Sequence, residues 1–82
     1  AARAFVQTAL TAGERRVVAV LVRHGASDQE IAARLTLSPR TVERHLGEAY
    51  AKAAVHWGLP AVSRAQLVAL LNLYYTSDPT ED

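Results

Sequence analysis

The residues best suited to bind a charged partner lie in one stretch, from Ser38 to Lys52. Ser38 is a favourable N-cap and Pro39 a favourable first helical residue, because the N–H group that proline lacks would have no partner there. The stretch therefore predicts a helix over about residues 39–56. At about 100° per residue its apolar residues share one side, and these are Val42, Leu46, Ala49, Tyr50 and Ala53.

The opposite side of this helix is basic at its start and then nearly free of bulky side chains. Arg40 and Arg44 carry the positive charge, Gly47 and Ala51 add little volume, and Glu48 lies on the same side. A glycine within a helix costs about 1 kcal/mol relative to alanine, so the close approach of a polar, anionic partner would explain Gly47. The alternative is an ordinary solvated face with an incidental glycine.

The side chains that catalysis or metal binding would need are not grouped in this sequence. His24, His45 and His56 are far apart, and the chain has no cysteine to complete a zinc site. The sequence also has no glycine-rich phosphate loop, no paired carboxylates in a plausible cleft and no activated nucleophile. We therefore expect no enzyme activity, no bound metal and no cofactor.

Length and composition fit one small domain. Eighty-two residues, half of them hydrophobic, suffice for one compact core. The apolar runs are far shorter than the roughly 20 residues of a membrane span, and no signal peptide is evident, so we expect a soluble, cytoplasmic protein without a membrane partner. The chain begins with Ala1 and contains no methionine, from which we expect an excerpt of a longer protein with further domains upstream.

The formal net charge of +1 hides an uneven distribution of charge. Three of the eight acidic residues lie in the last five positions, and without them nine basic residues face five acidic ones, a formal charge of +4. Local rather than total charge attracts a polyanion. We expect residues 77–82 to form an acidic disordered tail.

A capping box predicts the start of the first core helix. Thr11 and Glu14 are spaced so that each side chain caps the backbone N–H of the other. Gly25 suits the left-handed position that ends a helix, so we expect this helix over residues 12–24. Residues 1–9 have weak helical character and no start signal, and we expect a linker or a frayed helix there.

A second capping box, Ser27 with Glu30, opens a short helix over residues 28–35. Only two residues separate its end from the cap of the basic helix. Two helices joined by so short a turn match a helix-turn-helix arrangement, in which the second helix lies across the first and projects outward.

The last predicted helix, residues 64–75, is apolar nearly all round and follows a third capping box. Such a helix needs partners on two sides. One stripe fits the core, and the other consists of Ala65, Val68, Ala69 and Tyr75. This second stripe is either a dimer interface or is covered by the end of the first helix and the loop at Trp57.

Several short motifs occur together at a specific spacing. They are Leu10-Thr11, Glu14-Arg15, Gly25, Ser27, Glu30-Ile31-Ala32, Leu35, Leu37-Ser38, Thr41-Val42, His45-Leu46, Lys52 and Ser63-Arg64-Ala65-Gln66-Leu67-Val68. Together they resemble the LuxR-type (GerE-like) helix-turn-helix domain of bacterial transcription factors over about residues 10–71. The resemblance implies an all-α, small four-helix domain, expected over residues 10–76. It also implies that the third helix enters the DNA major groove and that the last helix pairs two copies on a two-fold symmetric site.

The largest departure from that family pattern is an insertion near residues 54–62. Between Lys52 and Arg64 the chain has about six residues more than the short connection of the family. We expect Trp57, within this insertion, to pack on the last helix. A smaller departure is Asp28, where the family often has asparagine, and we expect this change at a capping site to be innocuous.

Duplex DNA offers base edges for sequence and phosphates for affinity, and different side chains suit each. The resemblance implies that Glu43, Arg44 and Gly47 face the bases. Arg44 has the fork that binds guanine O6 and N7, Glu43 can accept from cytosine N4, and Gly47 allows the backbone to approach. Glu43 has an alternative role in an ion pair with a neighbouring arginine.

Phosphate contacts are expected from Ser38, Arg40, Thr41 and Lys52. Ser38, Thr41 and the first N–H groups of the helix suit a phosphate at the positive end of the helix dipole, and Arg40 and Lys52 attract it by charge. His45 lies at the edge of the core face, where we expect a structural hydrogen bond.

The leading hypothesis is the DNA-binding output domain of a bacterial transcriptional regulator, for example a response regulator, that binds double-stranded DNA as a homodimer. A receiver or ligand-sensing domain upstream and RNA polymerase are further expected partners. Two alternatives remain open. One is a helical interaction or dimerisation module that has lost DNA binding, which the low net charge and Glu43 and Glu48 favour. The other is a sigma-factor-like domain that contacts promoter DNA.

Overall fold

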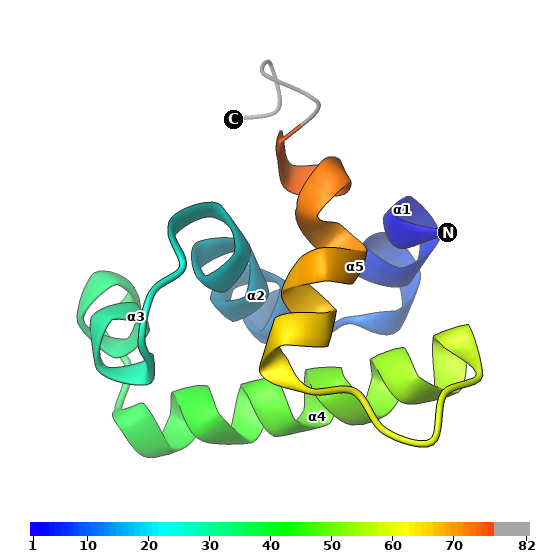
Figure 1. The fold of residues 1–82 in the computed structure, drawn as a ribbon. Coiled ribbons are helices and arrows are strands. Elements are labelled where there is room, and N and C mark those ends of the chain that lie inside the picture. The colour runs from blue at the N-terminus through cyan, green and yellow to red at the C-terminus, as the bar shows by residue number, and fades with distance from the viewer. Residues whose placement is uncertain (77–82) are drawn as a thin grey trace.

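The computed structural model describes residues 1–76, in which every regular element is helical (Figure 1). The elements are α1 (Ala2–Ala4), the π-helix η1 (Phe5–Ala9), α2 (Ala12–His24), α3 (Asp28–Leu35), α4 (Pro39–Trp57) and α5 (Arg64–Thr76). The predicted all-α class is confirmed, and α2 to α5 are the four expected helices. The expected acidic tail lies outside the described residues. Among the helices described, none combines the length and apolar character that crossing a membrane requires.

Reciprocal capping boxes begin three of these helices, as the sequence predicts. At α2, the Thr11 N–H donates to Glu14 Oε1 at 2.9 Å, and the Glu14 N–H donates to Thr11 Oγ1 at 3.2 Å. The same pair of bonds joins Ser27 with Glu30 and Ser63 with Gln66. Because a capping box satisfies two N–H groups within one turn, it fixes where each helix begins independently of tertiary contacts.

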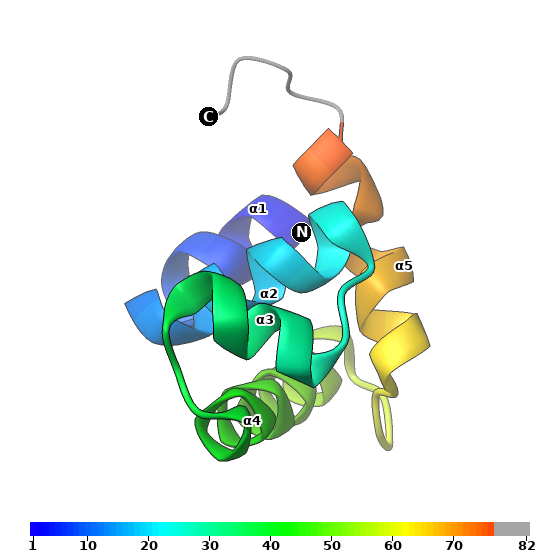
Figure 2. The ribbon, with the colours of Figure 1, turned by 90° about the vertical axis from the view of Figure 1, so that its left-hand side faces the viewer.

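Helix α2 lies at the centre of the domain and packs against α3, α4 and α5. Its buried apolar residues are Val17, Val18, Leu21 and Val22. They meet Ile31 and Ala32 of α3, the apolar side of α4, and Leu67 and Leu71 of α5 in one hydrophobic core. Figure 2, seen from the end of the domain where α3 lies, shows α3 in front of α2 and above α4, with α5 to one side, and α2 also packs directly against α4.

The turn between α3 and α4 is sharp because Thr36 adopts the left-handed conformation, with φ of 57°. Side chains other than glycine rarely adopt it, since the Cβ atom crowds the following carbonyl. The N–H groups of Thr36 and Leu37 both donate to the Ala32 carbonyl, so the last turn of α3 is closed. This conformation directs the chain into α4 within two residues, as the helix-turn-helix interpretation requires.

The N-terminal segment packs into the core, which differs from the expected linker or frayed helix. Phe5 is fully buried and Val6 nearly so. The Phe5 ring centroid lies 4.9 Å from that of Trp57 and 5.4 Å from that of His56. Helix α4 continues to Trp57, and its last turn provides an aromatic surface that residues 1–9 do not reveal by themselves.

Residues 54–62, where an insertion was expected, form the last turn of α4 and the connection that follows it. Gly58 ends α4 in the left-handed conformation, with φ of 67°, and Val62 returns to the core. The ring of Trp57 contacts those of Phe5 and His56, because the N-terminal segment lies over the end of α4. The expected packing of the Trp57 segment on the last helix stays a prediction.

If the N-terminal segment stabilises the fold, Phe5→Ala should lower the free energy of unfolding by about 3 kcal/mol, because removing a buried phenyl ring leaves a cavity. Urea denaturation measures this change. Gln7→Ala, at an exposed position of the same segment, should change stability by less than about 0.5 kcal/mol. An equally small effect of both substitutions would show that residues 1–9 add no packing energy.

Candidate nucleic-acid interface

Helix α4 forms one edge of the domain. In Figures 1 and 2, α2, α3 and α5 lie on one side of it, and the opposite side faces outward. The inward side is the predicted apolar one, with Val42, Leu46, Ala49 and Ala53 buried and Tyr50 partly buried. The helix is therefore anchored along its whole length and leaves a continuous surface free.

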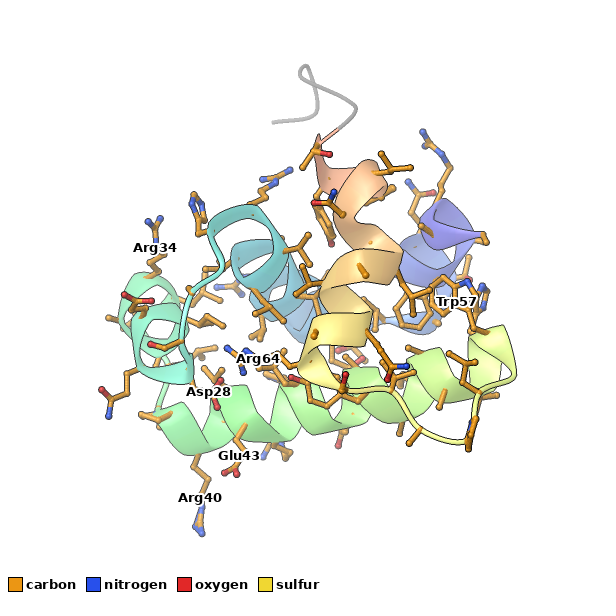
Figure 3. All side chains as sticks on the ribbon, in the orientation of Figure 1. Asp28, Arg34, Arg40, Glu43, Trp57 and Arg64 are labelled. Carbon is orange, nitrogen blue, oxygen red and sulfur yellow. The ribbon has the colours of Figure 1, made fainter. Side chains whose placement is uncertain are left out.

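The three residues expected to face bases lie on this outward surface. Glu43, Arg44 and Gly47 are all exposed, as is Arg40 one turn earlier. Figure 3 shows Arg40 and Glu43 pointing away from the rest of the domain. The structure thus brings these side chains to one face, which we call the α4 face.

Packing within the domain does not explain Gly47. A Cβ atom added there would meet nothing within 4 Å, so an alanine would fit without strain. Since glycine weakens a helix, its presence on an open face favours a role outside the domain, such as the close approach of a partner.

The first turn of α4 is arranged to attract an anion. Ser38 Oγ accepts from the Thr41 N–H at 3.1 Å and donates to Thr41 Oγ1 at 3.0 Å. The Ser38 hydroxyl proton is therefore engaged, and the Thr41 hydroxyl keeps a proton to donate outward. The first turn contains no acidic residue, so the partial positive charge of the helix end is not neutralised there.

Lys52, the fourth expected phosphate contact, is engaged within the domain. Its Nζ lies 2.7 Å from Oε1 of Glu14, whose side chain is 1% exposed. The Lys52 side chain is 36% exposed, so it is not fully enclosed by the domain. Sequence reasoning treated Glu14 only as a capping residue and missed this ion pair between α2 and α4.

The environment of Glu14 favours its ionised form. Burial raises the pKa of this carboxyl, but the hydrogen bonds from Lys52 and the Thr11 N–H lower it more, to about 2. An uncompensated buried charge would be strongly destabilising. The pair therefore joins the start of α2 to the middle of α4 and helps to set the orientation of the α4 face.

One group of potential metal ligands occurs beside this pair. Ligand atoms of Glu14, His45 and Glu48 lie within 4.8 Å of one another, a combination that the sequence analysis did not consider. The Lys52 ammonium already supplies the positive charge at Glu14, and a dication would be repelled by it. The group therefore fits an ion pair better than a metal centre.

His45 differs from the structural hydrogen bonder that we expected. Its Nδ1 is buried and has no hydrogen-bond partner among the described residues. The ring instead packs against Gly13, where an added Cβ would lie 3.1 Å from His45 Nε2. Its role is to fill the close contact between α2 and α4.

Arg64 holds the helix-turn-helix pair against α5. Its guanidinium donates to Asp28 Oδ1 at 2.9 Å and to the Ala26 carbonyl at 2.7 Å (Figure 3). Asp28 is therefore an ion-pair partner of Arg64 as well as a residue of the first turn of α3. Arginine suits this position because its planar fork donates to two acceptors at once.

The apolar stripe predicted for the last helix is only partly exposed. Ala65 and Ala69 are exposed, whereas Val68 and Tyr75 are partly buried against the core. Leu73, which the sequence analysis did not select, is 74% exposed. At 100° per residue Leu73 lies on the same side as Ala65 and Ala69, whereas Val68 and Tyr75 turn toward α2 and the core.

Comparison with known proteins identifies the family of this chain. The sequence profile of bacterial regulatory proteins of the luxR family (GerE) matches residues 8–70. The chain belongs to this family. It is therefore a LuxR-type helix-turn-helix DNA-binding domain of a transcriptional regulator, a class of domain without enzyme activity.

Curated relatives support the same assignment. The chain is 54% identical over 59 residues to "Putative HTH-type transcriptional regulator Rv0890c" of Mycobacterium tuberculosis strain H37Rv, and 51% identical over 59 residues to "Putative HTH-type transcriptional regulator Mb0914c" of Mycobacterium bovis. Each match covers 72% of this chain but 6% of the relative. The LuxR-type domain thus spans a small part of the length of these relatives. No solved structure gives a significant match.

The low pKa of Glu14 makes stability depend on pH. The folded-state pKa of about 2 lies below the ordinary value of 4.5, so the stabilisation is complete above pH 4.5 and is lost as the pH falls toward 2. We expect the difference in unfolding free energy between the wild type and Glu14→Gln to shrink by about 2 kcal/mol from pH 6 to pH 2, allowing for screening at the partly exposed Lys52.

Urea denaturation at several pH values tests this dependence. Glu30→Gln alters the corresponding residue of the exposed capping box of α3 and is the matched control. Its difference from the wild type should vary much less over the same range. A Glu14→Gln difference that does not change with pH would contradict the ion pair.

Proposed function

We propose that the LuxR-type domain binds duplex DNA sequence-specifically with α4 in the major groove. The main support for this proposal is the α4 face. It is exposed, it carries Arg40 and Arg44 near its start, and it has no side chain at Gly47. A major groove about 12 Å wide admits one α-helix, whose apolar side must then be held by the rest of the domain. The buried side of α4 meets that requirement.

Arg44, Glu43 and Gly47 are the proposed base-reading residues. The guanidinium of Arg44 is placed to donate to O6 and N7 of a guanine, and Glu43 to accept from N4 of a cytosine. Gly47 lies one turn further along α4, where the missing side chain lets the backbone approach the bases. The exposure of all three residues supports these roles.

The proposed phosphate contacts lie at the two ends of this reading surface. Thr41 donates through its hydroxyl, Arg40 adds charge, and Ser38 orients Thr41 through their mutual hydrogen bond. Lys52, whose side chain is 36% exposed beside Glu14, is the proposed phosphate contact at the other end. These contacts fix the position of α4 on the duplex but read no sequence.

We also propose that α5 pairs two copies of the domain on a two-fold symmetric site. The surface that supports this pairing comprises Ala65, Ala69 and Leu73, which we call the α5 face. Small side chains allow two helices to approach closely, and an exposed leucine gains stability when it is buried. Val68 and Tyr75, also expected in the interface, contribute at most at its edge because the core already covers part of each.

In the cell, this domain would act in the cytoplasm as the output domain of a regulator with a receiver or ligand-sensing domain upstream. RNA polymerase is the proposed further partner once DNA is bound. The assignment to the luxR family supports this setting.

Replacing Arg44 should reduce specificity. We expect Arg44→Ala to weaken binding to a duplex selected from a random library by about 1–3 kcal/mol, and to change binding to a scrambled duplex much less. Fluorescence anisotropy with both duplexes measures the two effects. An equal loss on both would remove Arg44 as a base reader.

Arg40→Ala is the matched control for Arg44→Ala, one turn earlier on the same face. It should weaken both duplexes alike and reduce the slope of log K against log salt by about 0.9, as for one phosphate contact. If the unaltered chain binds no duplex at low salt yet forms a stable dimer, the interaction-module alternative would be favoured.

Leu73→Glu should convert a dimer into a monomer, because two carboxylates would face each other across the proposed two-fold axis. Sedimentation equilibrium measures the association constant. Val55→Glu introduces the same charge at a residue that is 83% exposed on α4 and should leave the dimer intact. A dimer that is unaffected by Leu73→Glu would exclude the α5 face as the interface.

A further inference from the structure

A second basic surface lies between α2 and α5. A cleft of about 380 Å³ is lined on the α2 side by Arg15, Arg16 and Arg23, and on the α5 side by Tyr74 and Tyr75. The other lining residues, Val6, Ala12 and Ala19, are apolar. We call this site the basic cleft. Neither the family assignment nor the proposed DNA contacts give it a role.

The basic cleft opens on the side of α2 opposite to α4. Glu14 points toward α4, since its carboxylate binds Lys52. At about 100° per residue, Arg16 and Arg23 lie within roughly 20° of the direction opposite to Glu14. A duplex that contacts the α4 face therefore lies across the domain from these guanidinium groups.

Contacts within the domain hold the walls of the cleft in place. The Arg15 guanidinium donates to the Leu10 carbonyl at 3.0 Å. The Arg23 guanidinium lies 5.4 Å from the centre of the Tyr75 ring, a cation–π contact. The tyrosines form an edge-to-face pair with centroids 4.9 Å apart. The site therefore combines ordered cations with an aromatic wall.

The charge of the basic cleft is not balanced by its own walls. None of the described residues that line it carries a carboxylate. Burial raises the pKa of Tyr75 to about 12, and Tyr74 adds to this effect, so the phenol is neutral at physiological pH. The positive charge that Arg15 and Arg16 bring to the cleft thus suits an anionic ligand.

We propose that the basic cleft binds an acidic segment of a partner protein, whose carboxylates pair with Arg15 and Arg16 while an apolar side chain packs on the tyrosine wall. Arg15 and Arg16 are consecutive on α2 and lie beside an apolar and aromatic lining. Guanidinium groups next to such a lining fit a peptide that carries both carboxylates and an apolar side chain better than they fit one compact phosphate group. Arginine clusters recognise acidic motifs through bidentate hydrogen bonds. The inference does not depend on which residues of α4 read DNA.

The test uses the full 82-residue chain and a fluorescein-labelled decapeptide of glutamates with one central leucine, observed by fluorescence anisotropy at low salt. We expect saturable binding that weakens about tenfold with Arg16→Glu. Arg34→Glu is the matched control, because it makes the same charge change on an exposed residue of α3 that Figure 3 shows pointing away from the core. Circular dichroism melting verifies that both variants fold.

Four outcomes would overturn the proposal. The first is equal weakening by Arg16→Glu and Arg34→Glu, which would show nonspecific attraction. The second is a loss of duplex binding by the Arg16→Glu variant that equals its loss of peptide binding, which would show that the cleft is part of the DNA-binding surface. The third is peptide binding that occurs only after Asp78, Glu81 and Asp82 are changed to their amides, which would assign the cleft to the acidic end of this chain. Binding of an all-glutamine decapeptide with equal affinity would also contradict the role of the carboxylates.

Discussion

The direction in which α4 faces depends on one carboxylate that is taken almost completely out of water. Glu14 Oε1 accepts from the Thr11 N–H in its own capping box and from the Lys52 ammonium on α4. The same oxygen therefore defines where α2 begins and which residue of α4 lies beside it. Because a buried charge without a partner is costly, displacement of α4 by one turn would be strongly disfavoured.

A close contact two turns away along α4 completes this constraint. The His45 ring lies against Gly13, where any larger side chain would have to push it aside. Two points of α4, at His45 and Lys52, are thus held by consecutive residues of α2. Two such points fix both the crossing of the helices and the rotation of α4 about its axis, and so determine that Arg44 and Gly47 face outward.

The remaining elements hold this central pair of helices from either side. Arg64 joins the start of α5 to Asp28 and to the carbonyl of Ala26, just before α3. At the other end, the aromatic contact between Phe5 and Trp57 covers the last turn of α4. The α4 face and the α5 face therefore each belong to a helix that packs against α2, and the basic cleft lies between α2 and α5. This arrangement also explains how a chain of net charge +1 presents two separate basic surfaces.

The sequence by itself determined the features that arise from contacts within one helical turn. The capping boxes, the proline after Ser38 and Gly25 act between residues at most four apart, so they fixed the bounds of α2 to α5 closely and made the apolar side of α4 predictable. The luxR family pattern is built from the same local signals, which is why the expected α4 residues lie together.

The features that only the tertiary structure decided join residues far apart in the chain. Lys52 and Glu14 are 38 positions apart, and Arg64 and Asp28 are 36 apart. No local pattern shows that Phe5 meets Trp57, or that Leu73 rather than Tyr75 faces outward on α5. Such pairs form only when packing brings the helices together, because their stability comes from excluding water from surfaces that are separate in the sequence.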